Sequence, residues 1–281
     1  MKKIIEENSQ YYEITPPNGL IRLNLKEIWQ YKDLLYILVL RNIKVRYKQT
    51  IVGFAGAIIS PFFSMIIFTL VFGKLAKIPS DNIPYAIFVY AGLLYWNYFS
   101  AALSGASTSF VAEAGIIQKV YFPRLILPLS TSITPMIDFA IAITILGLLM
   151  IYYHFTPSLL GFFLIPVLLL IIFFTATGIG LISASLNVRY RDTSYALSFI
   201  IQVLLYLTPI IYPVSIVPKQ FQWLIFINPI AGVVTSARNS MLRTAPVDWF
   251  ILLISLGVSF MLLVLGIIYF RKAEKYFADV I

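Results

Sequence analysis

Long apolar stretches separated by short polar segments dominate the chain. Five of them, at about residues 51–73, 83–110, 125–153, 158–186 and 248–270, are long enough to cross a bilayer as a helix, which takes roughly 20 residues. A sixth, at about 194–212, is just long enough and ends at two prolines. The pattern predicts an all-α integral membrane protein with six transmembrane helices within residues 51–271.

Residues 25–48 have a different pattern, in which apolar and basic positions alternate at near-helical spacing. The apolar positions include Ile28, Trp29, Leu34, Leu35 and Leu38, and the basic positions are Lys26, Lys32, Arg41, Lys44, Arg46 and Lys48. Such a segment is typical of a helix that lies in the headgroup plane without spanning the membrane. It could be a simple membrane anchor, or it could transmit motion or admit a substrate.

Residues 213–246 contain apolar pieces that are too short to span a bilayer and are interrupted by Pro218 and Pro229. This pattern predicts re-entrant helices on the outer side, before the last span. Because non-helical backbone at that depth must be covered by protein or line a water-filled cavity, the segment is a candidate wall of a transport pathway.

The charged residues fix the predicted orientation. The chain of 281 residues is 60% hydrophobic and 12% charged, with a net charge of +9. The basic residues form short clusters beside apolar runs, which favours membrane flanks over a nucleic-acid surface. With the N-terminus inside, 16 of the 21 basic residues are cytoplasmic. We therefore expect a cytoplasmic tail at 1–24, without a signal peptide, and a cytoplasmic C-terminus at 272–281.

Motifs for enzymatic chemistry are absent from the sequence. There is no cysteine, the single histidine is His154 in a predicted outer loop, and no span contains two neighbouring carboxylates. Neither metalloprotease, serine-hydrolase nor phosphate-loop motifs occur. The chain is therefore expected to be neither an enzyme nor an ATP hydrolase, which argues against an integral-membrane glycosyl- or acyltransferase.

Two polar features lie within or between the predicted spans. Asp138 lies inside the third span, where a carboxylate must face protein or water, so it has either a structural hydrogen-bonding role or a gating or substrate role. The segment LNVRYRD, residues 186–192, is predicted to be the cytoplasmic turn between the fourth and fifth spans. Arg189 and Arg191 either anchor that turn inside or contact an ATPase or a substrate phosphate, while Asp192 pairs with one of them or caps the next helix.

Four stretches occur in an order that resembles one protein family. They are RNIKVRYKQTIVGFAGAIISP (41–61), KVYFPRLILPLS (119–130), LNVRYRD (186–192) and PIIYPVSIVP with INPIAGVV (209–234). Together they resemble the permease subunits of ABC exporters for O-antigen and related cell-surface polysaccharides, the type-2 ABC export permeases. The resemblance covers nearly the whole chain from about residue 30.

The resemblance implies the partners and the location of the protein. It implies a homodimer in the bacterial inner membrane, in contact with membrane lipids and not with nucleic acid. Two copies of a nucleotide-binding ATPase subunit would dock on the cytoplasmic side, and they, not this chain, would bind ATP and Mg²⁺. The cargo would be an undecaprenyl-diphosphate-linked glycan carried outward.

The resemblance also implies roles for particular residues. The ATPase-coupling segment would contain Glu113, Gly115, Ile116, Gln118, Lys119, Val120, Tyr121 and Phe122. The entrance for the lipid diphosphate would contain Arg41, Arg46, Lys48, Arg189 and Arg191, since arginine recognises phosphate bidentately. A sugar channel would be lined by aromatic residues, namely Phe62, Tyr90, Tyr95, Trp96, Tyr98, Tyr206 and Tyr212. A permease of the same fold for teichoic acid, capsule or drugs, and a passive channel, remain alternatives.

Overall fold

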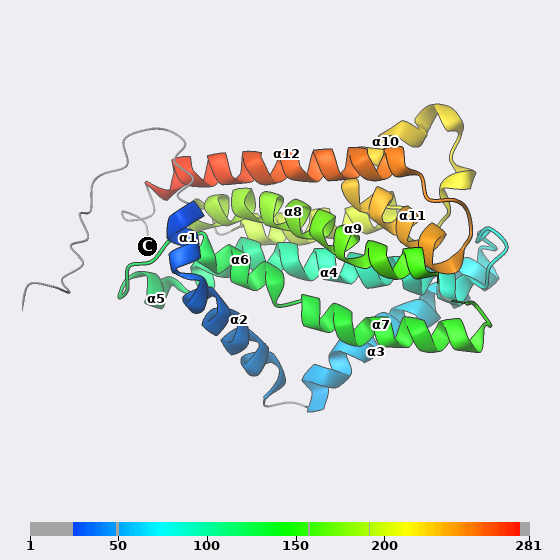
Figure 1. Ribbon diagram of the computed structural model, residues 1–281, viewed down its shortest axis with the longest axis horizontal. Coiled ribbons are helices and arrows are strands. Elements are labelled where there is room, and N and C mark those ends of the chain that lie inside the picture. Colours follow the sequence, from blue (N-terminus) through cyan, green and yellow to red (C-terminus); the bar gives the residue numbers. More distant parts are fainter. Residues whose placement is uncertain (1–24, 49–50, 157, 191, 276–281) are drawn as a thin grey trace, which may run out of the picture.

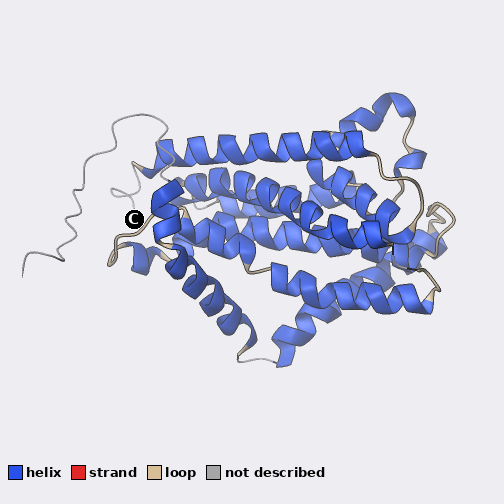
Figure 2. Cartoon of the chain, viewed as in Figure 1, coloured by secondary structure: helices blue, strands red, loops and turns tan. Residues whose placement is uncertain are grey.

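A computed structural model describes residues 25–48, 51–156, 158–190 and 192–275, and these residues form helices and loops without strands (Figure 2). The predicted tail at 1–24, Arg191 and the last six residues lie outside the described part. The long helices are α2 (Lys32–Tyr47), α3 (Ile51–Phe68), α4 (Tyr85–Ala112), α7 (Met136–Tyr152), α8 (Leu159–Arg189), α9 (Thr193–Leu207), α11 (Pro229–Leu242) and α12 (Trp249–Glu274). The short ones are α1 (Leu25–Gln30), α5 (Ala114–Ile117), α6 (Ile126–Ile133), α10 (Gln222–Phe226), a π-helical turn after α3 (Thr69–Leu75) and 3-10 turns at Val214–Ile216 and Lys219–Phe221.

Within the described residues, five segments are long and apolar enough to cross a membrane, which makes this a multi-pass membrane protein. They are Ile58–Leu75, Tyr85–Ala112, Ile126–Tyr152, Leu159–Arg189 and Trp249–Glu274, and they match the five long apolar stretches of the sequence. The predicted sixth span is α9, whose 15 residues extend for about 22 Å at 1.5 Å per residue. That length is short of a bilayer core of roughly 30 Å, so the sixth span stays a prediction.

The third predicted span is interrupted near its beginning. Residues 126–152 form two helices, α6 and α7, which meet at Thr134 and Pro135. Proline has no N–H to donate to the preceding turn and its ring clashes with that turn, which explains the break at this position. As a result Asp138 lies in the first turn of α7, and not in the middle of a continuous helix.

Helix α4 is the centre of the bundle. It packs against α3, α6, α7, α8, α9 and α11, and most residues from Ile87 to Phe110 are buried. Helices α8 and α12 approach each other closely at Gly178 and Gly266, where an added Cβ on either residue would meet the backbone of the other helix. Small residues at such a crossing let two membrane helices come into contact along their backbones.

The segments predicted to be cytoplasmic lie at one end of the bundle. Figure 1 places α1, α5 and the C-terminal end of α12 at its left end, whereas α10 and the loop before α4 lie at the right. Helix α2 runs obliquely away from the bundle, which is the placement expected of an interfacial helix. Residues 213–246 form short helical turns followed by α11, which is buried against α4, α8 and α12. Their re-entrant path remains a prediction.

Candidate functional site

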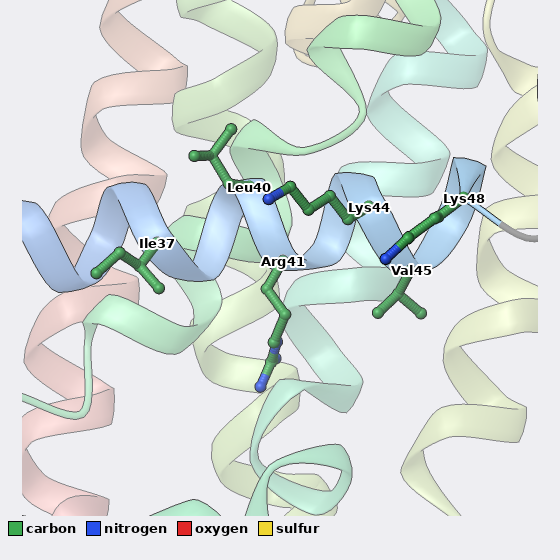
Figure 3. Close-up of a pocket in the computed structure, with 6 residues that line it drawn as sticks. All are labelled: Ile37, Leu40, Arg41, Lys44, Val45 and Lys48. Atoms are coloured by element: carbon green, nitrogen blue, oxygen red, sulfur yellow. The ribbon is translucent and has the colours of Figure 1, made fainter.

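The oblique helix α2 has a groove on its surface that combines apolar and cationic side chains. Its volume is about 490 Å³, and it is lined by Ile37, Leu40, Arg41, Lys44, Val45 and Lys48. Figure 3 shows these six side chains along the outside of α2. Two of the predicted entrance residues, Arg41 and Lys48, are therefore brought together, and Lys44 joins them. The opposite side of α2 packs on the bundle through Leu38.

The guanidinium group of Arg41 is held by a carboxylate from the predicted coupling segment. Nη1 of Arg41 donates to Oε2 of Glu113 at 3.0 Å, and Nη2 donates to Oε1. This bidentate geometry fixes both the position and the orientation of the guanidinium group. The pair joins the interfacial helix to the end of α4, where the coupling segment begins.

A second ion pair joins the C-terminal end of α2 to the start of α7. Nη1 of Arg46 lies 2.8 Å from Oδ2 of Asp138, and the hydroxyl of Tyr47 donates to Oδ1 of the same carboxylate. Burial and the Asp138 hydrogen bond raise the pKa of Tyr47 to about 12, so Tyr47 remains a donor at physiological pH. Arg46 is not among the groove residues, but its side chain is 44% exposed, so its place at the entrance stays a prediction. These contacts support the structural role considered for Asp138.

The predicted coupling segment divides into a buried and an exposed part. Phe122 is buried in a hydrophobic cluster with Leu38, Phe110 and Phe270, so its role is to hold the segment on the bundle. By contrast, the side chains of Val120 and Tyr121 are 58% and 72% exposed. The remaining residues of the segment form the short helix α5 and the loop after it, and Ile117, Gln118, Lys119, Val120, Tyr121, Phe122 and Arg124 line a hollow of about 250 Å³.

The polar turn after α8 is only partly described. Arg189 is exposed and its guanidinium lies 5.3 Å from the centre of the Tyr190 ring, whereas Arg191 falls outside the described residues. Asp192 precedes α9 at the N-cap position, but its side chain makes no capping hydrogen bond, so its expected capping role stays a prediction. Whether this turn meets an ATPase or a phosphate stays a prediction.

Four of the seven aromatic residues expected to line a channel lie in or against the core. Tyr90 and Tyr95 are fully buried, and Tyr98 and Trp96 are 2% and 4% exposed. Tyr90 donates to the carbonyl of Ala142, and Tyr95 packs on Phe139 with ring centres 5.1 Å apart. A fully buried side chain cannot contact a substrate, so the channel-lining expectation is corrected for Tyr90, Tyr95 and Tyr98.

The other aromatic candidates are accessible. Phe62 and Tyr206 are 37% and 55% exposed, and Tyr212 is half-buried with its hydroxyl donating to the carbonyl of Leu207 at 3.0 Å. Trp96 is buried like its neighbours, but it also borders a groove between α4 and α9. These residues remain candidates for contact with a substrate.

Arg238 is an important residue whose place the sequence did not indicate. Arginine side chains are mostly exposed in proteins, but Arg238 is 5% exposed within α11. It donates to the carbonyls of Phe88, Pro209 and Ile210 at 3.0, 2.5 and 2.6 Å, and its guanidinium lies 3.6 Å from the centre of the Phe88 ring. These carbonyls include those released where α9 ends, which a low-dielectric environment requires to be paired. The sequence did contain one indication that Arg238 is buried: it is a basic residue within a helix of mostly apolar and small residues.

The groove and its ion pairs contain no group suited to bond-making chemistry. Among the described residues no three His, Asp or Glu side chains lie close enough together to hold a metal ion. The two carboxylates of the site, Glu113 and Asp138, are each engaged by an arginine. The arrangement can bind an amphiphilic anion and can link the movements of α2, α4 and α7.

Comparison with known proteins assigns the family. The ABC-2 type transporter family matches residues 33–242. The chain is 29% identical over 250 residues to an O-antigen export system permease protein, RfbA, from Klebsiella pneumoniae, which covers 89% of this chain and 95% of that protein. It is 29% identical over 219 residues to the RfbA protein of Myxococcus xanthus, covering 77% and 83%, and 24% identical over 213 residues to the polysialic acid transport protein KpsM of Escherichia coli, covering 73% and 80%. The chain thus belongs to the ABC-2 type transporter family and is an export permease of that family.

Proposed function

We propose that this chain is the channel-forming subunit of an ATP-driven exporter that moves undecaprenyl-diphosphate-linked O-antigen, or a similar polysaccharide, from the cytoplasm to the outer side of the bacterial inner membrane. Three of the relatives are named for O-antigen export. The structural observation that carries the proposal is the groove on α2, because its chemistry matches the lipid-linked end of such a cargo.

The groove offers separate surfaces for a charged headgroup and an apolar chain. Lys44 and Lys48 are exposed, and the described part of the chain provides no carboxylate in contact with either. A diphosphate can accept hydrogen bonds from both ammonium groups, whose charges strengthen those bonds. Ile37, Leu40 and Val45 line the same groove and provide apolar contact for the polyprenyl chain.

In the proposed complex, two copies of the chain form the transport pathway and two copies of a separate ATPase dock on the cytoplasmic side. The exposed Val120 and Tyr121 are the residues that we assign to the ATPase contact. Tyrosine is among the residue types that are enriched at the anchoring positions of protein interfaces. The ATPase binds ATP and Mg²⁺, and this chain contributes positioning and the pathway.

The proposed mechanism has three steps. The lipid diphosphate first binds in the α2 groove. ATP binding and hydrolysis by the partner then displace the coupling segment, and the Arg41–Glu113 pair conveys that displacement to α2. The glycan finally passes outward between the two copies through weak contacts at many positions, which allow a long polymer to bind and still leave.

The proposal is tested by the ATPase activity of the complex, purified with its ATPase in lipid. Undecaprenyl-diphosphate-linked O-polysaccharide is expected to stimulate the activity, and Lys44→Ala with Lys48→Ala should raise the polysaccharide concentration needed for half-stimulation. The matched control is Lys74→Ala, which removes a lysine at the opposite end of the first span. Stimulation that is equal for both variants would contradict the groove as the binding site.

The alternative within this family is a different polymer. The relative named for polysialic acid transport favours an acidic capsule-type polysaccharide as the second candidate. Stimulation by such a polymer and not by O-polysaccharide would support this alternative.

A further inference from the structure

A polar hollow lies between the start of α8 and the loop that joins α11 to α12. Figure 1 places this loop at the end of the bundle opposite α5. The hollow has a volume of about 560 Å³ and is lined by Ser158 and Leu160 of the α8 start, by Asn239 and Ser240 of α11, and by residues 243–247. Because the spans α8 and α12 begin at Leu159 and Trp249, the hollow lies where two spans enter the membrane.

Both walls of the hollow are held by contacts within the protein. The hydroxyl of Thr244 donates to Oδ1 of Asn239 at 2.8 Å, and Nδ2 of Asn239 donates to the carbonyl of Pro246 at 3.4 Å. On the other side, the backbone of α8 comes so close to α11 that a Cβ added to Gly161 would lie 2.8 Å from the carbonyl oxygen of Ser240. The hollow is therefore a fixed feature of the fold.

The polar groups of the hollow favour an anion. Arg243 is the one charged residue among those that line it, and its side chain is exposed. The described part of the chain offers its guanidinium group no carboxylate. The hydroxyl of Ser158 makes no capping hydrogen bond to α8. A guanidinium group can donate two parallel hydrogen bonds to a phosphate, so a phosphate group suits this hollow.

An exposed apolar stripe runs along α8 from the hollow into the membrane. It consists of Leu160, which also lines the hollow, with Phe163, Val167 and Leu170, all of which are exposed. Spacings of three and four residues place these side chains on one face of the helix. The stripe is about 15 Å long at 1.5 Å per residue. That is half of a bilayer core of roughly 30 Å, the depth that one acyl chain occupies.

We infer that this hollow and stripe form a binding site for an anionic phospholipid, with the phosphate at Arg243 and an acyl chain along the α8 stripe. The leaflet is the one at this end of the bundle, which is predicted to be the outer one. The site is separate from the α2 groove at the other side of the membrane and does not depend on the proposed cargo.

The order of the two chemistries identifies the occupant. A phospholipid has its charge at the membrane surface and its chain directly below, and Arg243 lies above a stripe that contains only apolar residues. A helix of a second copy would have to match both the hollow and the stripe. The diphosphate of a polyprenyl lipid shares the phosphate chemistry, so the test must distinguish it from a phospholipid.

The absence of cysteine from the chain permits a direct test. Phe163→Cys carries a fluorescent label in the full complex with its ATPase, in phosphatidylcholine vesicles that contain a small fraction of phosphatidylglycerol with brominated, quenching chains. Leu148→Cys is the matched control, because it is 64% exposed and lies four residues from the end of α7, as Phe163 lies four residues from the start of α8. We expect stronger quenching at 163 than at 148, and equal quenching at both when phosphatidylcholine alone is brominated.

Three results would overturn the inference. Brominated phosphatidylcholine that also prefers position 163 would show an ordinary lipid-facing surface without an anion site. Equal quenching at 163 and 148 by phosphatidylglycerol would show that the stripe holds no bound phospholipid, as when a second copy covers it. Displacement of the brominated lipid by equimolar undecaprenyl diphosphate, but not by unbrominated phosphatidylglycerol, would assign the hollow to a polyprenyl diphosphate.

Variants of Arg243 test the phosphate contact. Arg243 has a φ of 54°, a left-handed conformation that asparagine tolerates, so Arg243→Asn removes the charge and keeps the backbone. It should raise the phosphatidylglycerol fraction needed for half-maximal quenching at 163 about two- to fivefold, as expected for an exposed charge pair. Arg243→Lys should recover part of that loss.

The control for charge is Lys219→Asn, which removes another exposed cation outside the hollow and should change nothing. Unchanged melting temperatures in detergent without phospholipid would show that the variants fold. An Arg243→Asn protein that folds and still needs the same fraction of phosphatidylglycerol would contradict the site.

Discussion

Arg41 of the interfacial helix α2 and Glu113 at the end of α4 form a bidentate ion pair. The two residues are 72 positions apart in sequence, and the sequence analysis assigned them to different sites, the substrate entrance and the ATPase-coupling segment. Their contact makes these sites adjacent. A displacement of the coupling segment by the ATPase can therefore reach the groove that binds the cargo.

Charge reversal tests this pair. Arg41→Glu places two carboxylates together and should uncouple ATP hydrolysis from export, while Arg41→Glu with Glu113→Arg should recover part of the export. The side chains are 36% and 20% exposed, so the coupling energy in a double-mutant cycle should be modest, about 0.5–1 kcal/mol. Export per ATP hydrolysed is the measurement, and additive effects of the two single changes would count against the link.

The pair between Arg46 and Asp138 should contribute to stability more than to binding. Asp138→Asn keeps an acceptor for the Tyr47 hydroxyl and loses the ion pair, whereas Asp138→Ala loses both. We expect melting temperatures in detergent in the order wild type, Asp138→Asn, Asp138→Ala, with polysaccharide affinity unchanged. A change in affinity with an unchanged melting temperature would instead indicate a role at the entrance.

Arg238 should be essential for folding of the outer end of the bundle. Arg238→Met removes three hydrogen bonds to buried carbonyls, and each unsatisfied group costs about 1–3 kcal/mol. The amount of folded protein and its melting temperature should fall sharply. Arg243→Met, which changes an exposed arginine at the end of the same helix, is the matched control and should have little effect. Similar behaviour of the two variants would be inconsistent with the assigned role.

The coupling segment should separate into docking and folding residues. Tyr121→Ala should weaken copurification of the ATPase while leaving the melting temperature unchanged, because this side chain is 72% exposed. Phe122→Ala should lower the melting temperature, since truncating a buried phenylalanine costs about 3–5 kcal/mol. The two variants are compared by ATPase recovery and by thermal unfolding, and the reverse assignment of effects would refute the division.

The hydrophobic pattern was sufficient to locate five membrane-spanning segments and the oblique helix, because bilayer thickness determines how long an apolar run must be. It could not indicate which face of a helix is buried. In the sequence, Tyr90 and Tyr95 cannot be told from accessible aromatic residues. In the structure they are buried, because other helices surround α4. Likewise, the hydrogen-bond partners of Arg238 could not be read from the sequence around it, since Phe88 and Pro209 are distant in sequence.

Only part of the candidate site could be predicted from the sequence, again because the sequence does not show which residues meet in space. The basic residues of α2 were identified by type and spacing, but the choice between groove and bundle depends on where the acidic partners lie in space. Glu113 and Asp138 pair with Arg41 and Arg46, whereas Lys44 and Lys48 are exposed and have no carboxylate partner among the described residues.

Transport itself is the most direct test of the proposed function. The chain and its ATPase are reconstituted in vesicles with the ATPase outside, lipid-linked polysaccharide is added to the outside, and polymer protected inside the lumen is measured with and without ATP. We predict accumulation that requires ATP, and that falls with Arg41→Glu and with the paired change Lys44→Ala and Lys48→Ala. Luminal polymer that accumulates equally without ATP, or none in a complex that hydrolyses ATP, would contradict the assignment as a polysaccharide exporter.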